Sequence, residues 1–207
     1  MPHDASSLWR GPAPLLLAST SPTRRALLAS AGLTVETRAP GVDERAVEAE
    51  AAGLSPARLA ERLAAAKAAA VASVAPDRVV IGADQVLDLD GTLFHKPADR
   101  AGAAAHLARL QGRLHALHSA VAVAVDGAVA DIFVVTARLT MRSLDEAAIT
   151  AYLDAAGPAV TGSVGAYQLE GAGINLFDRI EGDHSTILGL PLLPLLARLR
   201  GRGLLAF

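Results

Sequence analysis

Apolar and polar residues follow one another along the chain in short blocks that predict buried strands and amphipathic helices. The run Leu15–Ala18 is apolar and too short for a helix, so it predicts a buried strand. Ser21 and Pro22 come next and are typical of the first turn of a helix, which we expect to end near Gly32. The chain therefore opens with a predicted strand, a tight loop and a helix.

The same patterns predict the elements that follow. Apolar residues recur at helical spacing from Ser55 onward, and we expect helices over residues 55–70, 97–110, 143–155 and, past its prolines, 189–199. The third of these begins with the Ser-x-x-Glu capping box of Ser143 and Glu146. Buried strands are predicted over 77–83, 120–125 and 133–140, with Asp-Gly hairpin turns at 90–91 and 126–127. The glycine-rich stretch 157–173 is expected to be mostly loop and short strand.

The order of these elements indicates one α/β domain over residues 15–207, preceded by an N-terminal extension over residues 1–14. Helices and strands mix without strict alternation, and the two hairpins favour a mixed sheet. We expect the domain to carry a cleft. No role for the extension follows from its sequence.

Composition narrows the classes of function. The 207 residues carry a formal net charge of −2, which weighs against a partner as anionic as a nucleic acid polymer. The absence of cysteine excludes disulfides, thiolate catalysis and thiolate-bound zinc. No apolar run approaches the roughly 20 residues of a membrane span, and the N-terminus lacks the pattern of a secretion signal. A cytoplasmic protein without a membrane partner is expected.

The first cluster with chemical potential is Ser19, Ser21, Thr23, Arg24 and Arg25, on the loop and first turn after the first strand. A helix N-terminus offers free N–H groups, and hydroxyls and guanidinium groups add donors that suit phosphate oxygens. A plain capped helix with solvated arginines explains the same residues. Both interpretations stay open on this segment alone.

Two acidic positions are candidates for a metal site or for acid–base chemistry. Asp43 and Glu44 follow a Pro-Gly turn and could hold Mg²⁺, or form an ordinary acidic loop. Asp84 stands where the predicted strand 77–83 ends, so it could point into a cleft and bind a metal or take a proton. A turn-forming aspartate is the alternative.

Lysine is scarce in this chain, since Lys67 and Lys96 are its only two lysines. A compact ammonium suits phosphate, whereas codon bias toward arginine would explain the scarcity without any chemistry. His115 and His118 form a His-x-x-His pair, but no third ligand accompanies them and zinc is not expected.

The order and spacing of these motifs resemble the Maf family of nucleoside triphosphate pyrophosphatases. The resemblance begins with Leu-Ala-Ser-Thr-Ser-Pro-Thr-Arg-Arg from Leu17 and continues through Val-Asp-Glu at 42–44, Lys67, Gly-Ala-Asp-Gln at 82–85 and Lys-Pro at 96–97. It extends over residues 112–115, 170–174 and 180–182 to Gly-Leu-Pro-Leu at 189–192. Residues 15–199, nearly the whole chain, are covered.

The resemblance implies an elongated, mixed α/β fold of the Maf/ITPase-like kind, with two lobes around a nucleotide-binding cleft. It implies hydrolysis between the α- and β-phosphates with Mg²⁺ or Mn²⁺, giving a monophosphate and pyrophosphate. Asp84 matches the family's proton acceptor, and Glu44 matches a carboxylate of the metal and catalytic site, so both become metal candidates. The matching cations that face phosphates are Arg24, Arg25, Lys67 and Lys96. Family members are often homodimers, which we expect here by resemblance.

Three positions depart from the pattern of many family members. Gln85 replaces a threonine and Glu170 replaces a glutamine, which resembles the subgroup that hydrolyses 7-methyl-GTP. Thr23, at the first position of the family's Arg pair, is not the residue expected in that subgroup. A carboxylate accepts both donors of guanine's pairing edge and favours the positive charge of N7-methylation. Glu170 and Gln85 are therefore candidates for base recognition, while a salt-bridged loop glutamate is the alternative for Glu170.

Other functions remain to be separated from this one. The first alternative is a dTTP or UTP pyrophosphatase, and the second is a nucleotide-binding regulator of cell division without turnover. The presence of Glu44, Asp84, Lys67 and Lys96 argues against a dead site.

Overall fold

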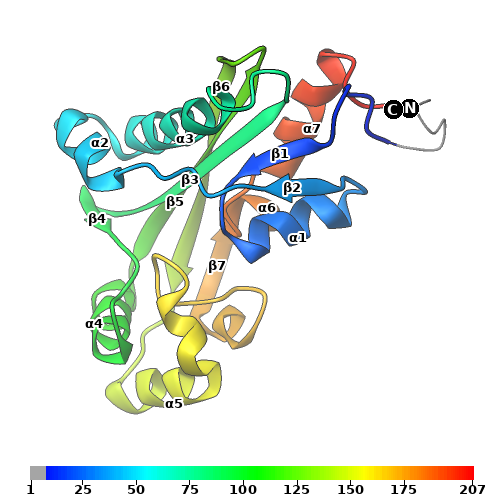
Figure 1. Ribbon diagram of the computed structural model, residues 1–207. Helices are drawn as coiled ribbons and strands as arrows, with labels where there is room; N and C mark the ends of the chain where they lie inside the picture. The colour runs from blue at the N-terminus through cyan, green and yellow to red at the C-terminus, as the bar shows by residue number, and fades with distance from the viewer. Residues whose placement is uncertain (1–7) are drawn as a thin grey trace.

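The computed structural model describes residues 8–207 and shows a mixed sheet with helices on both of its faces (Figure 1). The sheet has seven strands in the order β2-β1-β3-β5-β6-β7, and β4 pairs with β3 off this path. The strands β2, β1 and β3 are parallel, and the remaining pairs are antiparallel. The strands are β1 (Leu15–Ala18), β2 (Val35–Thr37), β3 (Val80–Leu89), β4 (Thr92–Phe94), β5 (Leu114–Val125), β6 (Ala128–Met141) and β7 (Phe177–Glu181). The predicted mixed α/β fold is confirmed.

Helices cover the two ends of the long strands differently. In Figure 1 the α4 and α5 helices lie at one end of β5 and β6, and α1, α3 and α7 surround the other end. The α-helices are α1 (Pro22–Ser30), α2 (Glu44–Glu50), α3 (Pro56–Ala72), α4 (Arg100–Leu110), α5 (Glu146–Ala156), α6 (His184–Ile187) and α7 (Leu192–Gly201). Two 3₁₀ helices, η1 (Gly157–Thr161) and η2 (Ala172–Leu176), complete the set.

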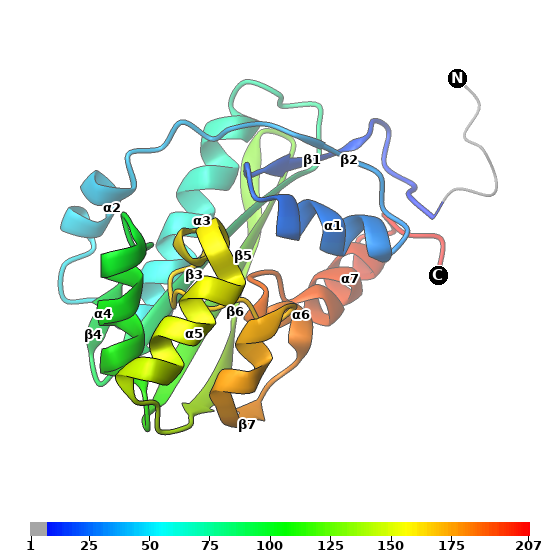
Figure 2. The same ribbon diagram turned by 90° about the horizontal axis from the view of Figure 1, so that it is seen from below.

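The apolar residues form three clusters that define two lobes. In the first lobe, α3 packs on one face of β1, β3 and β5, and α1 and α7 pack on the other. In the second lobe, α4, α5 and the 3₁₀ helices pack against the far halves of β3, β5 and β6. The two lobes can be followed in Figure 2, which views the molecule from below. The long strands are shared by both lobes, so the space between them has a fixed floor.

Several predicted elements are confirmed. The run Leu15–Ala18 is β1, the helix after Ser21 is α1, and Ser55 caps α3 by accepting from the Arg58 N–H. Both Asp-Gly hairpins are present. Asp90 and Gly91 have φ of 50° and 81°, and the second pair has φ of 51° and 77°, as type I′ turns require.

The prediction that a strand ends near residue 83 is wrong. The β3 strand continues to Leu89, because its pairing with β5 runs unbroken from Val80 to Asp88. Its other neighbour, β1, ends at Ala18 beside Gly82. The sheet therefore opens next to Asp84 on one side only, which still leaves that residue beside a cleft.

The sequence also misplaced one helix start and missed three elements, one of which is α2. The cap of α5 is Asp145, which accepts from the Ala148 N–H at 2.7 Å, and Ser143 does not cap it. The chain stays extended before Asp145 because the Arg142 N–H bonds the Leu176 carbonyl. Residues 157–173 hold 3₁₀ turns and loop where a loop and short strand were expected. No element was predicted for β7 or α6.

The predicted N-terminal extension is only partly described. Its residues 1–7 lie outside the described residues. Beyond them, the Arg10 N–H bonds the Leu204 carbonyl, and the Ala206 N–H bonds the Leu8 carbonyl, both at 2.9 Å. Residues 8–10 therefore pair with the C-terminal segment and pack beside α7. Within the described part of the chain, no helix is both long and apolar enough to cross a membrane.

Gly82 sets how closely α3 approaches the sheet. A Cβ at this position would lie 2.3 Å from the Ala64 carbonyl oxygen and 2.6 Å from the Ala68 nitrogen, both of which belong to the α3 backbone. Any side chain here would push α3 away from β3. Lys67 is carried by the same turn of α3 and Asp84 by the same strand, so this contact fixes their separation.

We expect Gly82→Ala to destabilise the fold by roughly 1–3 kcal/mol, because the added methyl group meets helix backbone that cannot rotate away. Chemical denaturation measures the change. Gly201→Ala is the matched control, since a Cβ there meets nothing within 4 Å and φ is not positive. Equal stability of the two variants would contradict this account of the α3–β3 contact.

Candidate functional site

A cleft of about 1270 Å³ opens between the lobes. Its walls come from the loop between β1 and α1, from α2 and α3, from the middle of β3, and from residues 93–96, 162–170 and 187–188. The structure brings ten of the predicted site residues to this cleft: Ser19, Ser21, Thr23, Arg24, Glu44, Lys67, Asp84, Gln85, Lys96 and Glu170. Arg25 is the exception, because its side chain is exposed and it does not line the cleft.

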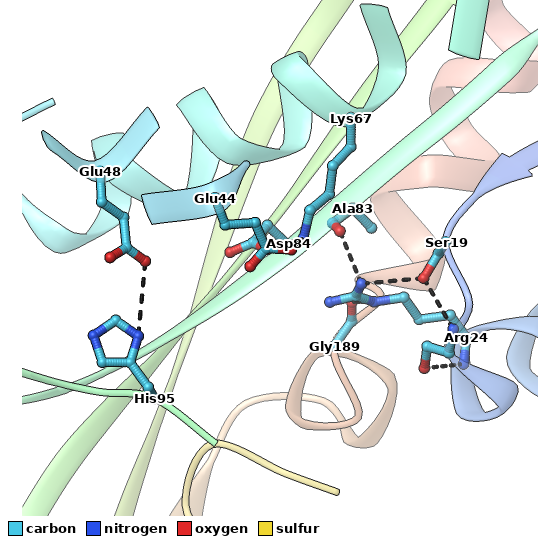
Figure 3. Close-up of polar contacts among 10 residues, drawn as sticks. Ser19, Arg24, Glu44, Glu48, Lys67, Ala83, Asp84, His95 and Gly189 are labelled. Atoms are coloured by element: carbon cyan, nitrogen blue, oxygen red, sulfur yellow. Dashed lines mark hydrogen bonds and ion pairs between the residues drawn. The ribbon is translucent and has the colours of Figure 1, made fainter. Parts of the chain in front are cut away.

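The centre of the site is an ammonium shared by two carboxylates. The Nζ of Lys67 lies 2.6 Å from Asp84 Oδ1 and 2.7 Å from Glu44 Oε1 (Figure 3). Lys67 and Asp84 are each 7% exposed, while Glu44 is more open to the cleft. Removing one partner would leave a buried charge unpaired, so the three groups constrain each other. Lys67 therefore reaches substrate only through these carboxylates or by exchanging one of them.

Arg24 is held by protein oxygens at the floor of the cleft. Its Nε donates to the Gly189 carbonyl at 2.9 Å, and its Nη1 donates to the Ala83 carbonyl at 2.8 Å. A longer contact of 3.5 Å joins Nη1 to Ser19 Oγ. Figure 3 shows the guanidinium between these groups and beside Asp84. Burial lowers the pKa of Arg24, and the nearby Asp84 and Glu44 oppose that shift. Its bonds go to neutral acceptors, and Nη2 has no partner among the described residues, so it can bind a ligand.

Ser21 does what the simpler interpretation of this segment predicted, since its Oγ accepts from the Arg24 N–H and caps α1. Thr23 is half-buried in the first turn of the same helix and lines the cleft. The N-terminal turn of α1 thus faces the cleft with its hydroxyls and one of its two arginines.

Two further cations line the cleft without an ion pair in the described part of the chain. Lys96 follows β4 and is exposed, and Arg45 lies in the first turn of α2 and is also exposed. Between the same two segments, His95 Nδ1 lies 3.7 Å from Glu48 Oε1, a largely exposed contact that contributes little by itself. Cations that are not neutralised by a carboxylate favour an anionic ligand here.

Gln85 points to the opposite face of β3 from Asp84. Its Nε2 donates to Ser119 Oγ and to the Ile187 carbonyl, both at 2.9 Å, with the Thr186 carbonyl at 3.2 Å. These acceptors fix the orientation of the amide. Its Oε1 has no partner among the described residues and is not sealed from solvent, so it can accept a hydrogen bond from a ligand.

Glu170 lies at the second-lobe wall of the cleft. Its side chain is exposed, and no ion pair holds it within the described residues, so the salt-bridged alternative is not what the structure shows. The loop that carries it is anchored below by His115, whose Nε2 lies 2.8 Å from the Tyr167 hydroxyl. His118 bonds Thr136 instead, and the two histidines serve different contacts.

The acidic residues of the cleft fit a divalent cation only if the substrate supplies some of its ligands. No group of three or more histidine or acidic side chains could hold a metal within residues 8–207. Glu44 and Asp84 nevertheless converge on one point at the edge of the cleft, where Lys67 now lies. Mg²⁺ is commonly bound by one or two carboxylates together with substrate phosphates. The two carboxylates fit that mode and no all-protein cage.

Residues 14–202 match the family model described as Maf-like protein. The chain belongs to the Maf family.

Curated relatives cover almost the same length as this chain. A nucleoside triphosphate pyrophosphatase of Nitrobacter hamburgensis is 56% identical over 200 residues, which is 97% of this chain and 99% of that protein. One from Nitrobacter winogradskyi is 58% identical with the same coverage. A 7-methyl-GTP pyrophosphatase of Rhizobium johnstonii is 53% identical over 191 residues, covering 91% of this chain and 96% of that protein. The recognised family resemblance is confirmed.

Among solved structures, a nucleoside-triphosphatase / dITP/XTP pyrophosphatase from Mycobacterium abscessus aligns with a TM-score of 0.45 and 18% identity. The alignment covers 93% of this chain and 96% of that one. A likeness at this level carries no argument about the site.

Sequence reasoning missed Arg45, the contact between Glu48 and His95, and the role of residues 184–190. A signal for α2 was present, because Asp43 caps the helix by accepting from the Ala46 N–H at 3.1 Å. The helix is short and buries little, so its periodicity is weak. Residues 184–190 act through backbone carbonyls, which no side-chain motif reveals.

His115 predicts a pH dependence of stability. Burial lowers its pKa to about 4, and the nearby backbone of Arg113 partly opposes the shift. The unfolded chain therefore binds this proton first as the pH falls, near its ordinary pKa of 6.5. The stabilising contribution is complete above pH 6.5 and is lost between there and about pH 4, about 3 kcal/mol in all.

Chemical denaturation at a series of pH values measures this loss. His115→Gln keeps a polar group near Tyr167 and cannot titrate, so its free energy of unfolding should fall less steeply over the same range. The variant is less stable at neutral pH, so the two proteins are compared by the slope of their free energy of unfolding against pH. An unchanged slope would show that other groups cause the acid sensitivity.

Proposed function

We propose that this chain, a nucleotide pyrophosphatase by its family and relatives, hydrolyses the bond between the α- and β-phosphates of 7-methyl-GTP. One observation carries the hydrolytic part of the proposal: Lys67 joins two carboxylates in the same cleft as Lys96 and Arg45, which form no ion pair among the described residues. Such a site attracts a polyphosphate and keeps a general base next to it. The products are a nucleoside monophosphate and pyrophosphate.

The cations on the first-lobe side would bind the phosphate chain. Arg24 presents Nη2 from the floor, while Lys96 lines the cleft from the segment after β4 and Arg45 lines it from α2. Neutralising phosphate charge lowers the barrier to attack by water and stabilises the leaving group. Arg24 is the most rigid of the three, because its Nε and Nη1 are already bonded to backbone. Arg25 lies outside the cleft, so its charge would affect the bound phosphates only through long-range electrostatic attraction.

Asp84 is the residue we assign as proton acceptor for the attacking water. It is held in place by Lys67 on one side and by its buried position on β3 on the other. Glu44 shares the same ammonium from the cleft side and would help to orient the water. Geometry of this kind supplies general base catalysis, provided that the water lies within hydrogen-bond reach.

Glu44 and Asp84 are the residues that would hold Mg²⁺ or Mn²⁺ together with substrate phosphates. When bound, the cation would supply charge neutralisation on the phosphoryl oxygens. The Lys67 ammonium lies on both carboxylates, so it would have to release one of them to make room. Lys67 would then be free to donate to a phosphate oxygen.

Base recognition is assigned to the second-lobe wall and to β3. Glu170 offers a carboxylate without an ion pair among residues 8–207, which can accept from the N1–H and N2–H₂ donors of guanine, and Gln85 offers a carbonyl oxygen without a partner there. A carboxylate also favours the positive charge of a 7-methylated base. The name of the Rhizobium johnstonii relative supports this substrate. A cytoplasmic location stays a prediction from the sequence, and a homodimer stays a prediction from the family resemblance.

Asp84→Asn should leave the fold intact and lower kcat by about 10²- to 10⁴-fold, since the amide cannot accept the proton. Pyrophosphate release with Mg²⁺ present measures the change. Asp88→Asn is the matched control on the same strand, because Asp88 bonds the Gly91 N–H of the hairpin and lies outside the cleft. Near wild-type turnover of the Asp84 variant would refute the assignment.

A substrate panel of 7-methyl-GTP, GTP, UTP and dTTP tests the base assignment. The wild-type protein should hydrolyse 7-methyl-GTP fastest, and Glu170→Gln should lower kcat/KM for it by roughly tenfold to a hundredfold while UTP and dTTP lose little. Glu181→Gln serves as control, because Glu181 lies on β7 outside the cleft. Faster hydrolysis of UTP or dTTP by the wild type would overturn the 7-methyl-GTP proposal. No release from any triphosphate would favour a regulator without turnover.

A further inference from the structure

Two residues of the cleft floor are held by the backbone of one short turn. Arg24 and Gln85 come from α1 and β3, yet both donate to carbonyls of the segment formed by α6 and Gly189. The Gly189 carbonyl accepts from Arg24, and the Thr186 and Ile187 carbonyls accept from Gln85. Whatever fixes this turn therefore fixes the orientation of both side chains.

The turn is itself fixed by one carboxylate. Asp183 Oδ1 accepts from the Thr186 N–H at 2.9 Å and from the Ser185 hydroxyl, and Oδ2 accepts from the Thr186 hydroxyl. Burial raises the pKa of Asp183, but these hydrogen bonds outweigh it and lower the pKa overall. Thr186 is fully buried. The carboxylate thus caps α6 through one backbone N–H and two hydroxyls.

The network then passes to the next elements. Ser185 Oγ also accepts from the Leu192 N–H at 3.0 Å, which ties the start of α7 to the same group. The Thr186 carbonyl accepts from the Ser119 hydroxyl at 2.7 Å, and Ser119 in turn accepts from Gln85. Every link from Asp183 to Gln85 is therefore a hydrogen bond between half-buried or buried groups.

Gly189 completes the arrangement. Its φ is +89°, and a Cβ there would lie 3.4 Å from Arg24 Nε and 3.7 Å from Gln85 Cδ. These are ordinary van der Waals distances, so it is the positive φ of the turn, and not crowding, that requires glycine at position 189. Asp183 itself does not line the cleft, whereas Ile187 and Leu188 of the turn do.

We propose that Asp183 is a positioning residue, which orients Arg24 and Gln85 through the carbonyls of α6 and Gly189 without touching substrate. The consequence is that the free Nη2 of Arg24 and the free Oε1 of Gln85 face the cleft only while α6 is capped. The kinetic part of this proposal rests on the proposed function, whereas the orientation of Gln85 does not.

The first readout needs no activity. The side-chain NH₂ signals of Gln85, assigned by their loss in Gln85→Ala, should exchange slowly with solvent in the wild-type protein. Asp183→Ala should shift them to the positions of an exposed amide and speed their exchange at least tenfold. Asp183→Asn can still cap α6 and should retain the wild-type signals. Unchanged Gln85 signals in a folded Asp183→Ala protein would overturn the proposal.

The second readout is a double-mutant cycle on kcat/KM for the triphosphate that the wild type hydrolyses fastest. Asp183→Ala should cost at least tenfold in the wild-type background and less in the Gln85→Ala background, because the part of its effect that passes through Gln85 is already lost there and only the part through Arg24 remains. Additive losses would mean that Asp183 does not act through Gln85, and would refute the positioning role. Absence of hydrolysis by the wild type would refute the proposed function. The positioning role of Asp183 would then be tested by the Gln85 signals alone.

Asp145→Ala is the matched control, because Asp145 caps α5 through the same i to i+3 bond and does not line the cleft. It should lower the melting temperature to a similar extent while the Gln85 signals and kcat/KM stay at wild-type values. Should Asp183→Ala not fold, Ser185→Ala removes one of the three hydrogen bonds to Asp183, and it should shift the Gln85 signals in the same direction by less.

Discussion

The site depends on one buried ammonium between two carboxylates. Lys67 reaches Asp84 and Glu44 together because α3 lies against β3 at a distance that only glycine at position 82 permits. Unpaired, any of these charges would be costly in a half-closed cleft. The contact therefore joins three separate elements, and it holds a base, a metal-binding pair and a cation at one point. The close approach of α3 to the sheet is thus as much a feature of the site as of the core.

Beside this centre, the floor of the cleft is organised by backbone carbonyls. Arg24 satisfies Nε and Nη1 on carbonyls from two distant segments, and Gln85 does the same with Nε2. Side chains that are bonded in this way present their remaining polar atoms in fixed directions, which reduces the entropy lost when a ligand binds. The first lobe supplies such rigid donors for phosphate. The second lobe supplies an exposed carboxylate, Glu170, on a loop that is anchored by His115 and Tyr167.

Much of the fold could be predicted from the sequence because caps and turns depend on residues that are close together in the chain. Caps at Ser21 and Ser55 and both Asp-Gly turns were predicted from residues only a few positions apart. The length of β3 could not be predicted in this way, because a strand continues for as long as a neighbouring strand pairs with it. Here β5 still pairs with β3 beyond the point where β1 ends. The cap of α5 was misplaced for a related reason, because pairing with residue 176 keeps the chain extended as far as Asp145.

The sequence by itself determined the family, the kinds of residue in the site and their order along the chain. Spacing along a sequence carries no information on which side chains meet across 17 or 165 residues, as Lys67 meets Asp84 and Arg24 meets Gly189. Only the tertiary structure decided that Lys67 serves two carboxylates, that Arg24 lies in the cleft while Arg25 lies outside it, and that backbone carbonyls orient Gln85. These are outcomes of packing, which depends on distances that only the folded chain defines.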